Sequence, residues 1–305
     1  MADYSDIIQK VWRRLEPTPP QPIKLLANYV SGSGTATFDY AAPSFELLMP
    51  GQMVSFGTNE VLIYGTPDPS TGVTTVVGGQ RGSTDANFAD TGLAWIGSRF
   101  TQFDIAGAVN DELLGLSSPN KGIGQVLTTD VTFVPAFNGY DLGTTFDTVR
   151  SRVLEVSYAK PSPDRSNPLI RRGRYRVIRA TSQASVFPNG NGIILYDQAF
   201  PGFPIHVTFL APFSPLVNLT DDVESVAGMP LYMQDILDMG VELRLAPDRE
   251  IERNSLSFQR DPRKAQEVPA TATSHAADNL LQRYRDRLND EASNIKRAWK
   301  NSEGW

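Results

Sequence analysis

The chain has 305 residues, no cysteine, two histidines and a formal net charge of −6. The absence of cysteine excludes disulfides, thiolate metal sites and cysteine nucleophiles, and two histidines are too few for a three-histidine zinc site. Hydrophobic residues make up 40% of the chain, which is enough for packed cores. The acidic balance argues against a strongly basic grip on nucleic acid, and no apolar run approaches the roughly 20 residues of a membrane span.

Residues 1–22 are predicted to form a short helix and a proline-rich linker. Asp3 or Ser5 is suited to cap the helix. Its apolar residues recur at spacings of three and four, which indicates one buried stripe: Ile7, Ile8, Val11, Trp12 and Leu15. The following prolines favour an extended segment. The N-terminus lacks the basic and apolar regions of a signal peptide, so we expect a protein that is used without secretion.

Residues 23–100 alternate short β-branched and aromatic runs with glycine and proline turns, which predicts a small barrel or sandwich. The predicted strands are Ile23–Val30, Gly34–Phe38, Met53–Phe56, Glu60–Tyr64, Thr74–Val77 and Leu93–Ile96. Residues 101–119 are predicted to return to helix, with Thr101 as cap and Pro119 as stop. In that helix Leu114 is expected on the apolar stripe and Glu112 on the polar side.

Residues 120–217 are predicted to form an antiparallel β-sandwich. The predicted strands are Gln125–Val134, Arg152–Tyr158, Arg174–Ala180, Ala184–Phe187, Ile193–Tyr196 and Ile205–Phe209. Alternation places His206 on the face opposite Ile205 and Val207, which favours a surface residue over a catalytic base. The loop Lys160–Arg174 is the most basic stretch of the chain.

Residues 218–300 are predicted to be helical with one interruption, and residues 301–305 form a tail that ends in Trp305. Asp221 and Glu224 have the spacing of a capping box. One helix is expected from Pro230 to about Leu245, and the last from about Ala276 to Lys300. The last helix has an apolar stripe at helical spacing: Leu281, Tyr284, Leu288, Ala292, Ile295 and Trp299.

The order helix, β module, helix, β module, helix, helix predicts an α+β fold. The two short helices are too short to be stable alone in water, so the four helices are expected to pack together as one discontinuous domain. The two antiparallel β modules are then insertions into that domain.

Two stretches of the chain resemble the head-to-tail adaptor (connector) proteins of tailed bacteriophages, particularly siphophages that infect actinobacteria. The first stretch is Pro50-Gly51-Gln52-Met53-Val54-Ser55-Phe56-Gly57, then Glu60-Val61-Leu62-Ile63 and the turn Gln80-Arg81-Gly82-Ser83-Thr84-Asp85-Ala86. It is similar to the small β module of that family. Where the family often has a histidine after this turn, the chain has Asn87-Phe88. The family's turn is similar to Arg-Gly-x-Gly-Thr, whereas this chain has Arg81-Gly82-Ser83-Thr84, without the second glycine.

The second stretch runs from Met229-Pro230 through Asp235-Ile236-Leu237-Asp238-Met239-Gly240-Val241-Glu242-Leu243-Arg244-Leu245 to Asp248-Arg249-Glu250 and Arg253. It is similar to the third long helix of the family. Gly240 at its centre lets two helices approach closely, at a cost of about 1 kcal/mol in helix propensity.

The resemblance implies a structural protein of the virion neck that is assembled in the host cytoplasm. It implies a homo-oligomeric, dodecameric ring that docks on the portal protein and meets a tail-side stopper or tail terminator, with DNA passing through the lumen without sequence specificity. No enzyme activity, cofactor, metal or membrane contact is implied. The residues expected in ring and helix packing are Leu237, Gly240, Val241, Leu281 and Leu288.

The C-terminal segment is expected to dock on the portal through Ile295, Trp299 and Trp305, since tryptophan is enriched at interface hot spots. The alternative is that Trp299 packs inside the chain's own bundle. Arg171, Arg172 and Arg174 could face DNA phosphates or a neighbouring subunit, or belong to a solvated loop.

Two other functions remain open from the residues alone. The first is a tail or baseplate protein whose β-sandwich binds a carbohydrate, and the second is a glycan-active enzyme. The aromatics that could stack on sugars or fill a core are Phe137, Tyr140, Phe146, Phe187, Phe200 and Phe203. No motif singles out a catalytic pair of carboxylates.

Overall fold

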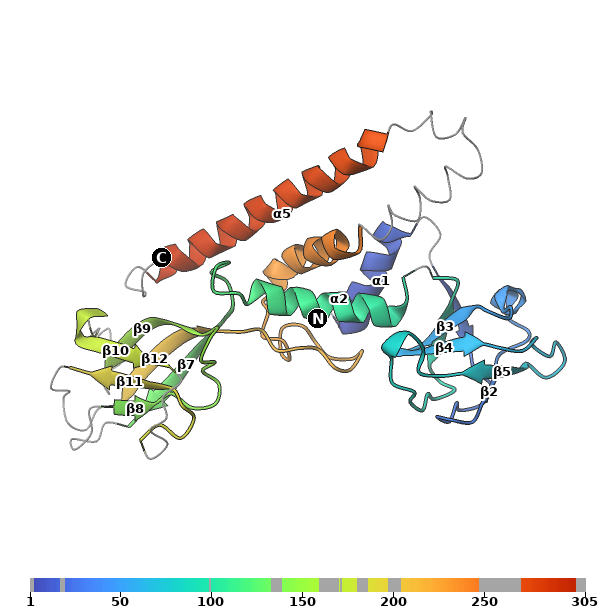
Figure 1. Ribbon diagram of the computed structural model, residues 1–305, viewed down its shortest axis with the longest axis horizontal. Helices are drawn as coiled ribbons and strands as arrows, with labels where there is room; N and C mark the ends of the chain where they lie inside the picture. The colour runs from blue at the N-terminus through green and yellow to red at the C-terminus, as the bar shows by residue number, and fades with distance from the viewer. Residues whose placement is uncertain are drawn as a thin grey trace. The chain divides into compact units, whose positions relative to one another are not determined.

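The computed structural model describes residues 3–16, 20–98, 100–132, 139–158, 170, 172–179, 186–196, 204–246 and 270–299. It has an α+β fold with four helices and three antiparallel sheets in this part of the chain (Figure 1). The chain divides into two compact units. The first comprises Met1–Glu112, Leu216–Glu224 and Leu231–Leu281, and the second comprises Leu113–Pro215, Ser225–Pro230 and Gln282–Trp305.

Helix α1 (Tyr4–Leu15) confirms the first predicted helix. Asp3 is its N-cap residue, and the backbone N–H of Asp3 donates to Asp6 Oδ2 at 3.3 Å. The predicted stripe is buried, together with Tyr4. Helix formation here follows from the 3.6-residue period of large apolar side chains, which only a helix places on one face.

The small β module of the first unit is a six-stranded sheet in the order β1-β6-β3-β4-β5-β2. Its strands are β1 (Gln21–Lys24), β2 (Thr35–Thr37), β3 (Met53–Phe56), β4 (Asn59–Ile63), β5 (Val73–Val77) and β6 (Leu93–Ile96). The two edge strands approach each other, because Leu25 bridges Phe38 just beyond their ends. This confirms the predicted small barrel-like module around one core of aromatic and β-branched side chains.

One predicted strand of this module is wrong in its bounds. The strand expected at Ile23–Val30 begins at Gln21 and ends at Lys24. Pro22 lies within it, and a proline is tolerated there because β1 is an edge strand that leaves one row of N–H groups unpaired.

Helix α2 (Gln102–Leu116) has the predicted cap, because Thr101 Oγ1 accepts from the Asp104 N–H at 3.1 Å. Two of its side chains lie opposite to their predicted environment. Leu114 is 47% exposed, whereas Glu112 is only 3% exposed. An ion pair with a second helix buries Glu112, and sequence periodicity does not detect such a partner.

The second unit contains two three-stranded sheets, β10-β11-β8 and β7-β12-β9. Their strands are β7 (Gln125–Val131), β8 (Gly139–Asp141), β9 (Arg152–Tyr158), β10 (Tyr175–Ile178), β11 (Gly192–Leu195) and β12 (Ile205–Ala211). One hydrophobic core contains residues of both sheets, including Ile193 of β11 and Phe209 of β12, as the predicted sandwich requires. Strand β8 was not predicted. Of the strand expected at Ala184–Phe187, the described residues Val186 and Phe187 are not in a strand.

The helical segments after residue 217 differ in part from the prediction. Residues 221–229 are not helical, and Asp221 accepts hydrogen bonds from the preceding backbone N–H groups of Val217 (2.8 Å) and Asn218 (2.7 Å). Asp221 therefore holds a turn instead of capping a helix. Residues 234–246 form the expected helix, and α5 (Ala270–Ala298) begins six residues earlier than predicted.

Candidate functional site

Three helices that are distant in sequence contact one another in the first unit. Tyr4 Oη in α1 donates to the Ala106 carbonyl of α2 at 2.7 Å, and Trp12 Nε1 donates to the Phe100 carbonyl at 2.7 Å. Both donors are buried, and burial is the main reason that the pKa of Tyr4 is raised. These bonds fix α1 against the start of α2.

Ion pairs connect the helix at 234–246 to both other helices. Lys10 and Arg14 of α1 pair with Asp238 and Glu242, and Arg244 Nε donates to Glu112 Oε2 of α2 at 2.7 Å. The hydrogen bond to Glu242 raises the pKa of Arg14. The Asp238 side chain is 1% exposed and the Glu112 side chain 4% exposed. Removal of one basic partner would leave a buried, uncompensated carboxylate, which is strongly destabilising.

The residues predicted for helix packing lie at this contact and along α5. Leu237 and Val241 are fully buried. A Cβ placed on Gly240 would lie 2.5 Å from Glu112 Cδ, so the glycine makes room for this carboxylate. Leu281 is half-buried and Leu288 is 9% exposed, both on α5. Whether these residues also meet a second subunit stays a prediction.

The small β module is joined to α2 through a buried carboxylate. Glu60 of β4 accepts from the Phe103 N–H of α2 at 3.1 Å and from Ser55 Oγ of β3 at 3.0 Å. Ser55 Oγ in turn accepts from the Gln102 N–H at 3.3 Å. Glu60 thus satisfies a free N–H at the positive end of the helix. Burial raises the pKa of Glu60, although the hydrogen bonds from Phe103 and Ser55 oppose the shift.

The turn that carries the first resemblance is held by Asp85. Its carboxylate accepts from the Gly32 N–H at 2.8 Å, Tyr29 Oη at 2.9 Å, Ser31 Oγ at 3.0 Å and Asn59 Nδ2 at 3.1 Å. Desolvation alone would raise the pKa of Asp85, but these donors outweigh it and lower the pKa. Strand β4, through Asn59, and the segment from Tyr29 to Gly32 therefore converge on one side chain.

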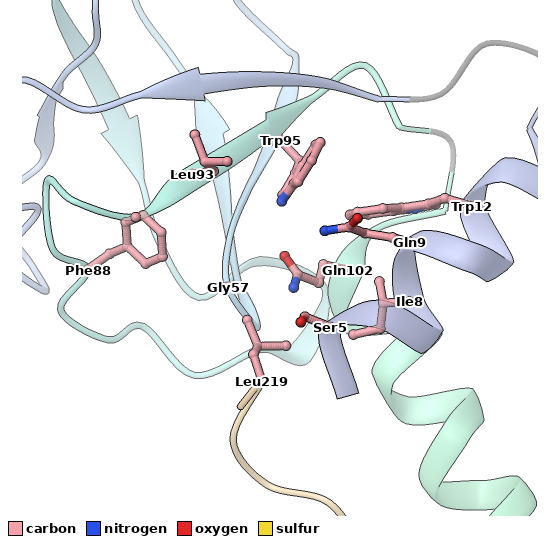
Figure 2. Close-up of a pocket in the computed structure, with 11 residues that line it drawn as sticks. Ser5, Ile8, Gln9, Trp12, Gly57, Phe88, Leu93, Trp95, Gln102 and Leu219 are labelled. Carbon is pink, nitrogen blue, oxygen red and sulfur yellow. The ribbon is translucent and has the colours of Figure 1, made fainter. Parts of the chain in front are cut away.

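A cavity of about 260 Å³ lies within the first unit, between α1 and the small β module (Figure 2). Its apolar walls are Ile8, Trp12, Phe88, Leu93, Trp95 and Leu219. Polar side chains also line it: Ser5, Gln9 and Gln102. The Trp12 and Trp95 rings are 5.5 Å apart between centroids and tilted by 54°. No sequence motif indicated this cavity, because its walls come from five separate segments of the chain.

The polar group of Gln102 has no partner in the described part of the chain. Gln102 is 4% exposed, and its Oε1 atom is buried without a hydrogen bond. Buried polar atoms are almost always paired, so an unpaired one calls for an explanation. Figure 2 shows its carboxamide beside the side chains of Ser5 and Gln9, with the indole nitrogen of Trp95 directed toward it.

The residues predicted to dock on the portal lie only partly within the described chain. Ile295 is half-buried on α5, and Trp299 is half-buried one residue beyond the end of that helix, where its N–H donates to the Ile295 carbonyl at 3.0 Å. Trp305 lies outside the described residues. Of the predicted basic patch, Arg174 is exposed, whereas Arg171 and the side chain of Arg172 lie outside the described part.

His206 lies on the face of β12 opposite Ile205 and Val207, as alternation predicted: those two residues are fully buried, whereas the His206 side chain is 27% exposed. His206 contacts Asp130 of β7, and its register partner on β9 is Ser157. The residue types of a hydrolase triad therefore lie in one row. In the described chain no hydrogen bond joins His206 to Ser157, so the row lacks the contact between base and nucleophile.

The aromatics considered for sugar stacking are buried where they are described. Tyr140, Phe146 and Phe187 are between 1% and 6% exposed, and the first two belong to the sandwich core. Phe137, Phe200 and Phe203 lie outside the described residues. The three buried rings thus fill the interior.

Within the residues that the structure describes, no group of three or more histidine, aspartate or glutamate side chains is placed to hold a metal ion. None of the helices described is long and apolar enough to cross a membrane. Comparison of the sequence with protein-family models and with curated proteins gives no match.

Proposed function

We propose that this chain is a structural virion protein, the head-to-tail adaptor of a tailed bacteriophage. In this proposal it acts by assembly, without catalysis, cofactor or metal. It forms a dodecameric ring in the virion neck that docks on the portal protein and meets the tail-side stopper or tail terminator, while DNA passes through the lumen.

The observation that carries the proposal is the contact among α1, α2 and the helix at 234–246. These helices are separated by two β modules, yet hydrogen bonds and ion pairs join them in one unit. A helical centre with β insertions is the organisation that the resemblance implies. The two stretches that carry the resemblance also lie at structural junctions, the Asp85 turn and the Gly240 contact.

Electron microscopy of the purified protein, alone and mixed with the portal protein of the same virus, tests the proposal. We expect a monomer or weak oligomer alone, because the short helices suggest a core that neighbouring subunits complete, and a closed ring on the portal. A stable two-fold dimer in both samples would contradict the adaptor function.

A further inference from the structure

The cavity beside α1 has the features of a binding site for a small, flat molecule. Its volume of about 260 Å³ exceeds the roughly 150 Å³ that accepts benzene and approaches the lower limit of drug-sized pockets. Aromatic rings of Trp12, Trp95 and Phe88 line it. The Trp12 indole is fixed by its bond to Phe100, so one wall is preformed. This size and these walls suit a ring system of about two fused rings.

The unpaired polar groups define what such a ring must carry. Gln102 offers an acceptor, Oε1, and a donor, Nε2, both bonded to Cδ, and neither has a partner in the described chain. The indole N–H of Trp95 likewise donates to no described acceptor. The terminal torsion of a glutamine is soft, so the carboxamide turns toward a ligand without movement of α2. A ligand with adjacent N–H and C=O groups would satisfy both ends of the carboxamide.

Charge restricts the ligand further. None of the eleven lining residues is charged. A carboxylate, phosphate or ammonium group would therefore gain no counter-charge from the cavity walls to offset the hydration that it loses there. We propose that this cavity binds an uncharged planar lactam, with its N–H on Gln102 Oε1, its C=O facing Gln102 Nε2 and the Trp95 N–H, and its ring against the tryptophan rings.

The test uses the full-length protein and the bicyclic lactam 2-quinolone, with N-methyl-2-quinolone as the matched probe that lacks the N–H. Affinities are measured by isothermal titration calorimetry. We expect the N-methyl compound to bind about 3- to 10-fold more weakly, the range for loss of one neutral hydrogen bond. Failure of 2-quinolone to bind, or equal affinity for both probes, would overturn the proposal.

The Gln102→Met variant distinguishes loss of the lactam hydrogen bond to Gln102 from a steric effect of the N-methyl group of the probe. The variant keeps the side-chain length but removes both polar atoms, so we expect the two probes to bind within about 2-fold of each other. Gln52→Met is the matched control, since Gln52 does not line the cavity. A preference for 2-quinolone that survives in Gln102→Met contradicts the assignment of the lactam to Gln102.

A second measurement needs no variant of Gln102. Among the four tryptophan indole N–H resonances, that of Trp95, assigned by Trp95→Phe, should shift on titration with 2-quinolone. Binding that leaves the Trp95 resonance unchanged would place the ligand elsewhere and overturn the site. Neither the calorimetry nor the Trp95 resonance shift depends on ring formation. A negative result in either one would therefore overturn the lactam site and leave the adaptor proposal untouched.

Discussion

The backbone of Gly240 approaches the Glu112 side chain so closely that an alanine Cβ would lie 2.5 Å from its Cδ and Oε1 atoms. Glu112 cannot move freely, because it is buried and paired with Arg244. The glycine therefore allows a charged contact between two helices, in addition to the close approach expected from its size.

The Gly240→Ala variant should have a free energy of unfolding about 1–3 kcal/mol lower than that of a matched glycine-to-alanine variant, because overpacking usually costs this much. The control is Gly107→Ala in α2, where a new Cβ meets nothing within 4 Å. That control should gain up to about 1 kcal/mol from helix propensity. Urea unfolding of both variants measures the difference, and equal stability would show that Glu112 relocates without cost.

Gly78→Ala should disrupt the Asp85 turn. A Cβ there would overlap Asp85 Oδ1 and lie 2.7 Å from Tyr29 Oη. We expect a loss of about 1–3 kcal/mol, because the hydrogen-bonded carboxylate must shift. Hydrogen exchange at the Gly32 N–H, which donates to Asp85, reports the change locally. Unchanged protection of that amide would contradict the predicted overlap.

Glu60 should make stability depend on pH. Its pKa is raised in the folded state, so between its unfolded value and its folded value the native protein binds more protons than the unfolded chain. The free energy of unfolding therefore falls as pH rises through that window. Glu60→Gln keeps an acceptor for Phe103 and should remove this fall, as measured by denaturant unfolding from pH 4 upward.

Glu60→Ala is the comparison for that experiment. It leaves the partly buried Phe103 N–H without its acceptor, which costs up to about 1–3 kcal/mol. At neutral pH we expect Glu60→Gln to be about as stable as the wild type and Glu60→Ala to be clearly less stable. An alanine variant as stable as the glutamine variant would mean that Glu60 does not support the start of α2.

Deletion of Asn301–Trp305 tests the docking prediction. Chain ends are usually ordered only when a partner holds them, and a buried tryptophan at an interface is worth about 2–4 kcal/mol per subunit. We expect a folded protein by circular dichroism that decorates portals poorly in electron micrographs. Trp305→Ala alone should have most of the effect. Complete decoration by the deletion variant would assign docking to the helix faces.

Local sequence patterns were sufficient to predict many of the helices and strands. The stripe from Ile7 to Leu15 could be predicted as a helix because large apolar residues at spacings of three and four have one low-energy arrangement. Strands β3, β6 and β9 were predicted with the bounds observed, since their β-branched and aromatic runs are bordered by turn residues. His206 was assigned correctly to the face opposite Ile205 and Val207 because side chains alternate with the two-residue period of a strand.

Tertiary contacts decided the rest. Glu112 and Glu60 look like surface residues in the sequence, but each is buried by partners that lie 132 and 43 residues away, Arg244 and Phe103. The cavity is likewise made of residues from segments that only the fold brings together, with Gln102 at its polar end. Sequence periodicity records which face of an element is apolar. It does not record which distant charge or ring will cover that face. In this protein those distant partners create the ion pairs, the Glu60 contact at the start of α2, and the cavity.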